Sequence, residues 1–203
     1  MLEHRTFVRF AALFEAALVV VAIVIAQLTG VTPTVMAAGA GTWLIGVIAT
    51  LPLIALYYVL ASVPFGPLQK IHTLLLATLG RPLSQCRWHE LALLALLAGV
   101  CEEFLFRGVL QPWLEQWGTT TGWVGTNLIF GLAHAVTPTY FVLAAAIGAY
   151  FSGLQWYAGG LVAPILAHSL YDWFAFVQIA RAYRRSQSGE DEQDERGTFG
   201  KEG

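Results

Sequence analysis

Residues 91–113 read LALLALLAGVCEEFLFRGVLQPW, an apolar stretch long enough to cross a lipid bilayer that nevertheless carries charged side chains near its middle. These side chains are Glu102, Glu103 and Arg107. A single charged side chain costs about 2.5 to 3.5 kcal/mol in mid-bilayer, so intramembrane ionisable residues usually face a protein interior and act there. The stretch therefore predicts a membrane helix with a buried polar site.

Two later apolar segments also carry ionisable groups. His134 interrupts the run 122–136, and His168 and Asp172 interrupt the run 161–180. At 1.5 Å per residue, Glu102 lies about 17 Å, His134 about 17 Å and His168 about 11 Å from the start of its own segment. All three fall in the middle half of the membrane, so we expect one buried site assembled by several helices.

The composition indicates a membrane protein. Of the 203 residues, 57% are hydrophobic and 12% are charged, whereas about a quarter of the residues of ordinary soluble proteins are charged. The net charge is −2, and there is no basic patch or stripe of the kind that nucleic-acid binding needs. We therefore expect membrane lipids as partners and no nucleic acid.

Six apolar segments approach the roughly 20 residues that a membrane-spanning helix needs. They are residues 8–28, 42–63, 91–113, 123–135, 140–157 and 161–180. The first follows Arg5 and Arg9 but is longer than the apolar part of a signal peptide, so it reads as a retained helix. The pattern predicts an all-α polytopic membrane bundle of about six transmembrane helices.

The distribution of Lys and Arg predicts the orientation of this bundle. Basic residues precede the first span, lie between the second and third, and follow the sixth, whereas residues 29–41, 114–122 and 158–160 contain none. Since positive charges favour the cytoplasmic side, we expect a multi-pass protein with both termini cytoplasmic, in the plasma membrane if the source is prokaryotic.

Two polar segments flank the predicted spans. Residues 65–79 alternate apolar and polar side chains, which suits either a helix lying in the membrane interface or a plain connecting loop. From Ser186 onward the chain has almost no apolar residues and many charges, which predicts a short disordered cytoplasmic tail.

The three charged residues of the third predicted span form one i, i+4 pair and leave one acid, Glu102, outside it. Glu103 and Arg107 are spaced i, i+4, so we expect an internal ion pair that fixes helix packing. Glu102 points about 100° away from that pair on a helix. A carboxylate in a poorly solvated pocket suits a general base that takes a proton from water and later returns it.

The two histidines add groups that can share one water or one metal ion. His134 lies on the same helix face as Phe130 and Asn127, and His168 is spaced i, i+4 from Asp172. Two histidines with carboxylates are a zinc ligand set with an open position for water. The same groups can also activate water and stabilise an oxyanion without a metal, and the sequence leaves both routes open.

These residues form three motifs in order. The run Glu102 to Arg107 resembles the E-E-x-x-x-R motif of the CAAX protease and bacteriocin-processing (CPBP) family of intramembrane proteases. The run Phe130 to His134 resembles its F-x-x-x-H motif, and His168 to Asp172 its H-x-x-x-N/D motif. The resemblance covers residues 90–180.

The resemblance implies a role for each residue. It suggests Glu102 as the water-activating base, His134 as its partner or a metal ligand, and His168 as a ligand or oxyanion donor. Glu103 and Arg107 would support them.

Asp172 departs from the pattern of the prenyl-protein-processing members, which carry Asn at this position. An ionised Asp cannot donate a hydrogen bond as Asn can. This indicates metal binding or orientation of His168, and it weakens a prenylated CAAX protein as the expected substrate.

The sequence thus predicts an intramembrane endopeptidase that hydrolyses peptide bonds of membrane-associated or lipid-anchored substrates. Its parts would be two N-terminal spans with a connector (1–88), a CPBP-like catalytic core of four helices (89–182) and the polar tail (183–203). Two other readings remain: a proton- or ion-coupled transport component, and a non-catalytic membrane scaffold or immunity protein.

Overall fold

The computed structural model describes residues 4–36, 38–63 and 65–199, and these contain helices and no strand. The elements are α1 (His4–Thr29), α2 (Ala40–Ser62), α3 (Gly66–Gln85), α4 (Trp88–Glu103), the π-helix η1 (Phe104–Leu110), α5 (Gln111–Leu114), the 3-10 helix η2 (Glu115–Trp117), α6 (Thr119–Ala133), α7 (Pro138–Ala158) and α8 (Val162–Phe199). The prediction of an all-α fold is confirmed.

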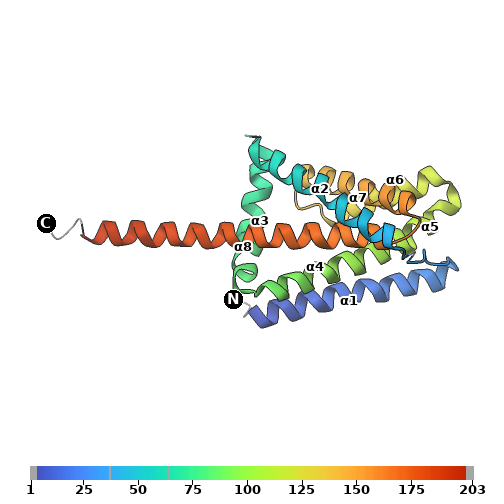
Figure 1. Cartoon of the computed structure of the whole chain (residues 1–203), viewed down its shortest axis with the longest axis horizontal. Helices are drawn as coiled ribbons and strands as arrows, with labels where there is room; N and C mark the ends of the chain where they lie inside the picture. Colours follow the sequence, from blue (N-terminus) through green and yellow to red (C-terminus); the bar gives the residue numbers. More distant parts are fainter. Residues whose placement is uncertain (1–3, 37, 64, 200–203) are drawn as a thin grey trace.

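Helix α8 lies at the centre of the bundle. It packs against α2, α3, α4 and α7, and its C-terminal part projects beyond the other helices. Helices α1 and α4 run side by side along one edge, and α3 crosses the end of the bundle steeply (Figure 1). Because α8 contacts four neighbours, polar groups on its N-terminal half can meet groups from several helices.

Among the residues that the structure describes, three helices are long and apolar enough to cross a membrane, namely α1, α2 and α7. They correspond to three of the six predicted spans. Helix α4 has 16 residues and α6 has 15, so each alone is shorter than the roughly 20 residues that a span needs. The count of six transmembrane helices therefore stays a prediction.

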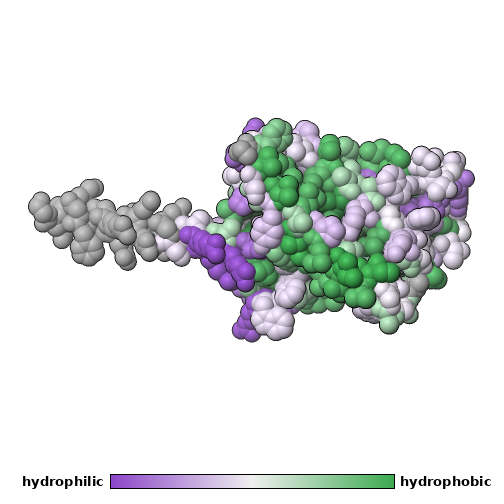
Figure 2. Space-filling view, turned by 45° about the horizontal axis from the view of Figure 1, so that its top comes forward, coloured by the Kyte–Doolittle hydropathy of each residue, from purple (hydrophilic) through white to green (hydrophobic). Residues whose placement is uncertain are grey.

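The surface of the bundle is broadly apolar (Figure 2). Large hydrophobic side chains such as Val20, Leu44, Leu51 and Val142 are more than half exposed. Hydrophilic residues gather near the end from which α8 projects. An apolar surface of this extent marks a membrane or protein contact region in a folded chain.

Two expectations about the polar segments are resolved differently by the structure. The connector for which a helix or a loop was expected is helix α3, which has Pro67 in its first turn, where proline is tolerated. Helix α8 continues to Phe199, although the composition from Ser186 predicts disorder. Once a helix is nucleated, each further residue adds one backbone hydrogen bond, so a packed helix can extend into a polar segment. Residues 200–203 lie outside the described residues.

A close approach of α4 and α8 depends on Gly99. A Cβ atom at this position would lie 2.9 Å from the backbone nitrogen of Ser169 and 3.0 Å from the carbonyl oxygen of Ile165. Glycine therefore allows the two backbones to pack more tightly than any other residue would. Since Gly99 is one turn before Glu102, and Ser169 follows His168, this contact sets the distance between acid and imidazole.

The helical run interrupted by η1 needs additional hydrogen-bond donors. A switch between α- and π-helical bonding shifts the register of backbone pairs and can leave carbonyls without their usual partners. Here the segment after α1 provides donors: the Thr34 nitrogen donates to the Gly108 carbonyl (2.8 Å), and its hydroxyl donates to the Arg107 carbonyl (3.2 Å). The connection between α1 and α2 thereby stabilises the π-helix that carries Arg107.

Candidate active site

The site is centred on the Glu102 carboxylate. Its Oε2 atom lies 3.8 Å from His134 Nε2 and 4.0 Å from His168 Nε2. This oxygen is enclosed and has no hydrogen-bond partner among the described residues. Both separations exceed a direct hydrogen bond, and polar groups at such distances are commonly bridged by water. Groups from α4, from the end of α6 and from α8 therefore meet, as the sequence predicts.

Both imidazole rings are anchored through their Nδ1 atoms. His134 Nδ1 lies 2.9 Å from the carbonyl oxygen of Phe130, which can only accept, so this nitrogen carries the proton. His168 Nδ1 donates to Glu103 Oε1 at 2.9 Å. The two Nε2 atoms consequently face Glu102. An imidazole whose other nitrogen donates to a carbonyl or carboxylate is oriented for metal ligation or proton transfer.

His168 has further contacts that fix its ring. Asp172 Oδ2 lies 3.5 Å from its Nε2 atom, and the ring of Phe151 stacks on it with centroids 4.8 Å apart and planes 15° from parallel. The i, i+4 spacing of His168 and Asp172 thus brings the two groups together as expected. Asp172 is placed to orient His168 or to share a ligand with it.

Arg107 and Glu103 form the predicted ion pair, with 2.9 Å between Arg107 Nη1 and Glu103 Oε1, and both are fully buried. Arg107 Nη2 also donates to Asn127 Oδ1 (3.1 Å) and to the Gly148 carbonyl (2.7 Å). The guanidinium carbon lies 4.6 Å from the centre of the Phe130 ring. Asn127 and Phe130 therefore support Arg107, and Glu103 links this group to His168.

Helix α7 contributes residues that the sequence motifs do not reveal. Ser152 Oγ accepts from Arg107 Nε at 3.4 Å, and Gly148 and Phe151 make the contacts described above. No charged residue occurs in α7, so nothing in its composition indicated a polar site. The available signal was the i, i+4 pair of small residues, Gly148 and Ser152, in an apolar helix.

Glu15 is a second carboxylate that the motif analysis missed. It lies on the same face of α1 as Leu18 and Ala22, which pack against the π-helix region. One of its carboxyl oxygens is enclosed without a hydrogen-bond partner among the described residues, and the group interacts electrostatically with Glu102 and His168. A lone acid within the apolar run 10–28 was the signal that could have identified it.

Gly148 on α7 lies in close contact with Arg107 and Asn127, so a larger residue at this position should destabilise the protein. A Cβ atom here would lie 2.9 Å from both Arg107 Nη2 and Asn127 Oδ1. We expect Gly148→Ala to lower stability by about 1–3 kcal/mol, the usual effect of overpacking, and to lower the thermal unfolding midpoint measured in detergent micelles.

The matched control is Gly153→Ala on the same helix, where a Cβ atom would meet nothing within 4 Å. Alanine is favoured over glycine by up to about 1 kcal/mol in a helix, so this variant should unfold at the same or a higher temperature. Equal midpoints for the two variants would show that Gly148 is not a required close contact.

Part of the chain is similar to one known protein family. A family model described as type II CAAX prenyl endopeptidase Rce1-like matches residues 84–174. No curated protein and no solved structure matches the chain. The matched region contains all three motifs, so the resemblance to this protease family is confirmed. Residues 84–174, slightly less than half of the chain, are similar to the Rce1-like family of type II CAAX prenyl endopeptidases.

Proposed function

We propose that this protein is a multi-pass intramembrane endopeptidase that hydrolyses a peptide bond of a membrane-associated or lipid-anchored protein. The observation that supports it best is the position of two imidazole Nε2 atoms 3.8 and 4.0 Å from one enclosed oxygen of Glu102. The Glu102 side chain is only 12% exposed. A site of this kind restricts bulk water and strengthens electrostatic interactions within it.

In the proposed reaction, a water molecule lies between Glu102 and His134. The Glu102 carboxylate takes one proton as the water oxygen bonds to the scissile carbonyl carbon. The nitrogen of the scissile bond then takes this proton from Glu102 as the carbon–nitrogen bond breaks. The products are a new carboxyl terminus and a new amino terminus, and Glu102 is again ionised.

His168 is suited to stabilise the negative oxygen that forms during attack. Its Nδ1 atom donates to Glu103, and its Nε2 atom faces Glu102 and Asp172. Both ring nitrogens face carboxylates, so both can carry protons, and the Nε2 proton can be donated to the oxyanion. Arg107 holds Glu103 in place and thereby positions His168.

The donors also fit zinc in kind, since imidazole nitrogens and carboxylate oxygens are its usual ligands and Glu102 Oε2 has no other described partner. His134, His168, Glu102 and Asp172 would hold the ion. When bound, zinc would polarise the scissile carbonyl and acidify a bound water.

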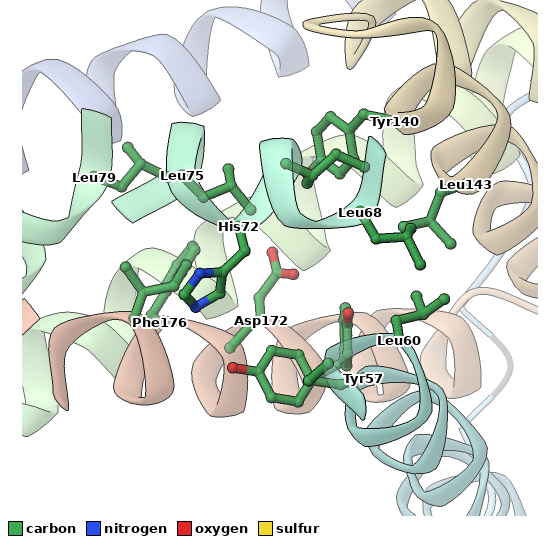
Figure 3. A pocket seen from close by; sticks show the side chains of 15 residues that line it. Tyr57, Leu60, Leu68, His72, Leu75, Leu79, Tyr140, Leu143, Asp172 and Phe176 are labelled. Atoms are coloured by element: carbon green, nitrogen blue, oxygen red, sulfur yellow. The ribbon is translucent and has the colours of Figure 1, made fainter. Parts of the chain in front are cut away.

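A cavity of about 190 Å³ lies beside Asp172, whose carboxylate points into it between α3 and α8 (Figure 3). Its wall is mostly apolar and includes Leu60, Leu68, Leu143 and Phe176. Apolar cavities with a few polar groups are typical ligand sites. We infer that it receives an apolar side chain or the lipid anchor of the substrate.

Filling this cavity should weaken substrate use without unfolding the protein. Ala175 lines it on α8, and we expect Ala175→Phe to lower kcat/KM about tenfold, since one apolar group in a pocket contributes about 1–3 kcal/mol. Ala182→Phe, on the same helix but outside the cavity lining, is the control. Equal kcat/KM values for both variants in liposomes would exclude the cavity as a substrate site.

Profiling of protein termini in membranes tests the proposed function. Cells carry either the unaltered chain or the Glu102→Gln variant at equal amounts, and the termini of their membrane proteins are compared by mass spectrometry. We expect at least one membrane protein with a new terminus that depends on Glu102. Identical termini in both cell lines would indicate a non-catalytic protein instead.

A further inference from the structure

A second cluster of ligand-type side chains lies outside the active site. His4 is at the start of α1, Cys86 directly follows α3, and Glu90 is in the first turn of α4. One ligand atom from each of the three residues lies within 4.8 Å of the others. The start of α1 and the junction between α3 and α4, which are far apart in the sequence, thus bring an imidazole, a thiol and a carboxylate to one point.

The three groups differ in exposure in a way that suits a bound ion. Cys86 is buried at 4% exposure, whereas the side chains of His4 and Glu90 are 27% and 23% exposed. A ligand could therefore reach the thiol from the side of the imidazole and the carboxylate, and solvent could occupy a remaining position.

The distance between the imidazole and the carboxylate is close to that of a zinc site, and the sulfur lies within 4.8 Å of both. With bonds of about 2.0 Å to nitrogen or oxygen and about 2.3 Å to sulfur, neighbouring donors of a tetrahedral zinc ion lie roughly 3.3–3.6 Å apart. His4 Nε2 lies 3.1 Å from both carboxylate oxygens of Glu90. The Cys86 thiol donates to the Pro82 carbonyl oxygen at 3.3 Å.

The Glu90 carboxylate also accepts a hydrogen bond from outside the cluster. Its Oε2 atom accepts a hydrogen bond of 2.7 Å from the backbone nitrogen of Arg87. Such outer contacts orient a ligand before the metal binds and are typical of metal sites in proteins. A simple hydrogen-bonded pair explains the contact of His4 with Glu90, and packing beside Leu83 and Leu91 explains why Cys86 is buried. Neither requires the thiol to lie within 4.8 Å of the other two ligand atoms, as it does.

We propose that His4, Cys86 and Glu90 bind one Zn²⁺ ion, with water as a fourth ligand. On binding, the Cys86 thiol releases its proton to solvent, and the thiolate sulfur bonds to the ion. Glu90 lies 12 residues before Glu102 on the same helix, about 18 Å along its axis, so this site is separate from the active site. The ion would fasten the start of α1 to the start of the helix that carries the catalytic carboxylates.

Cobalt substitution tests the proposal, because a thiolate bound to Co²⁺ gives a charge-transfer absorption band in the near ultraviolet. The full chain is purified in detergent micelles with an affinity tag that contains no histidine and is titrated with CoCl₂. We expect the band to appear and to disappear on addition of one equivalent of Zn²⁺. Absence of the band from the unaltered chain would overturn the proposal.

The chain has two cysteines, which provide a matched pair of variants. We expect C86S to lose the band and C101S to keep it. The E102Q/H134A double variant should also keep it, since the active site is not involved. Retention of the band in C86S, or its loss in monodisperse C101S, would overturn the proposal.

Zinc affinity provides a second readout for the other two ligands. We expect H4A and E90Q each to weaken Zn²⁺ binding at least tenfold, measured by competition with a chelating dye in the E102Q/H134A background. Zn²⁺ should raise the thermal midpoint of C101S but not that of C86S. Unchanged affinity in both H4A and E90Q would reject these ligands.

Discussion

Replacement of Glu102 by glutamine is expected to lower peptide-bond cleavage by about 10²- to 10⁴-fold, the usual contribution of a general base. Glutamine has the same shape, but its amide cannot take a proton from water and return it. The affected oxygen of Glu102 has no hydrogen-bond partner among the described residues, so the amide removes no internal contact of that atom. The variant should therefore fold normally.

Glu115→Gln is the control for this experiment. Glu115 lies in the same helical run, where its carboxylate accepts from Gln111, away from the two histidines. Initial rates are measured for both variants in liposomes with a substrate found by terminus profiling, and thermal midpoints are recorded in parallel. Cleavage by Glu102→Gln at the unaltered rate would remove Glu102 from the mechanism.

Arg107→Ala is expected to lower stability by about 3–5 kcal/mol, because it leaves a buried carboxylate without its partner. Glu103 is fully buried and would lose the guanidinium at 2.9 Å. Asn127, Gly148 and Ser152 would lose the hydrogen bonds that Arg107 donates to them. The free energy of unfolding of a whole protein is only about 5–15 kcal/mol. Most molecules of this variant should therefore fail to fold, or should unfold at a lower temperature.

Thermal unfolding in detergent micelles measures this effect, with Arg181→Ala as the control. Arg181 is exposed on α8, so its loss should change stability by less than about 0.5 kcal/mol. Arg107→Lys should also be destabilised, since one ammonium cannot reproduce the forked contacts of a guanidinium. A normal midpoint and normal turnover for Arg107→Ala would contradict its supporting role.

The sequence predicts the central part of the site well because charge is rare in its apolar segments. Glu102, His134 and His168 stand out against their neighbours, and the depths predicted for them from the sequence are similar. The i, i+4 spacing also predicts the pair of Glu103 and Arg107. Each of these inferences needs only the period of a helix and the cost of burying charge.

Other parts of the site depend on how helices pack, which the sequence does not specify alone. Gly148 and Ser152 meet Arg107 only because α7 lies against the π-helix region, and small residues are common in apolar helices for several reasons. The hydrogen bond between Glu103 and His168 joins residues that are 65 positions apart in the sequence. The π-helix itself has no composition that distinguishes it from an α-helix, although Thr34 supplies the donors it needs.

Rates of the variants E102Q, H134A and E102Q/H134A in liposomes test most directly whether Glu102 and His134 act on one shared water. Groups that act as one unit give strongly non-additive losses. We expect the double variant to cleave no more slowly than the slower single variant. Losses that multiply, so that the double variant shows the product of the two single effects, would contradict a common site.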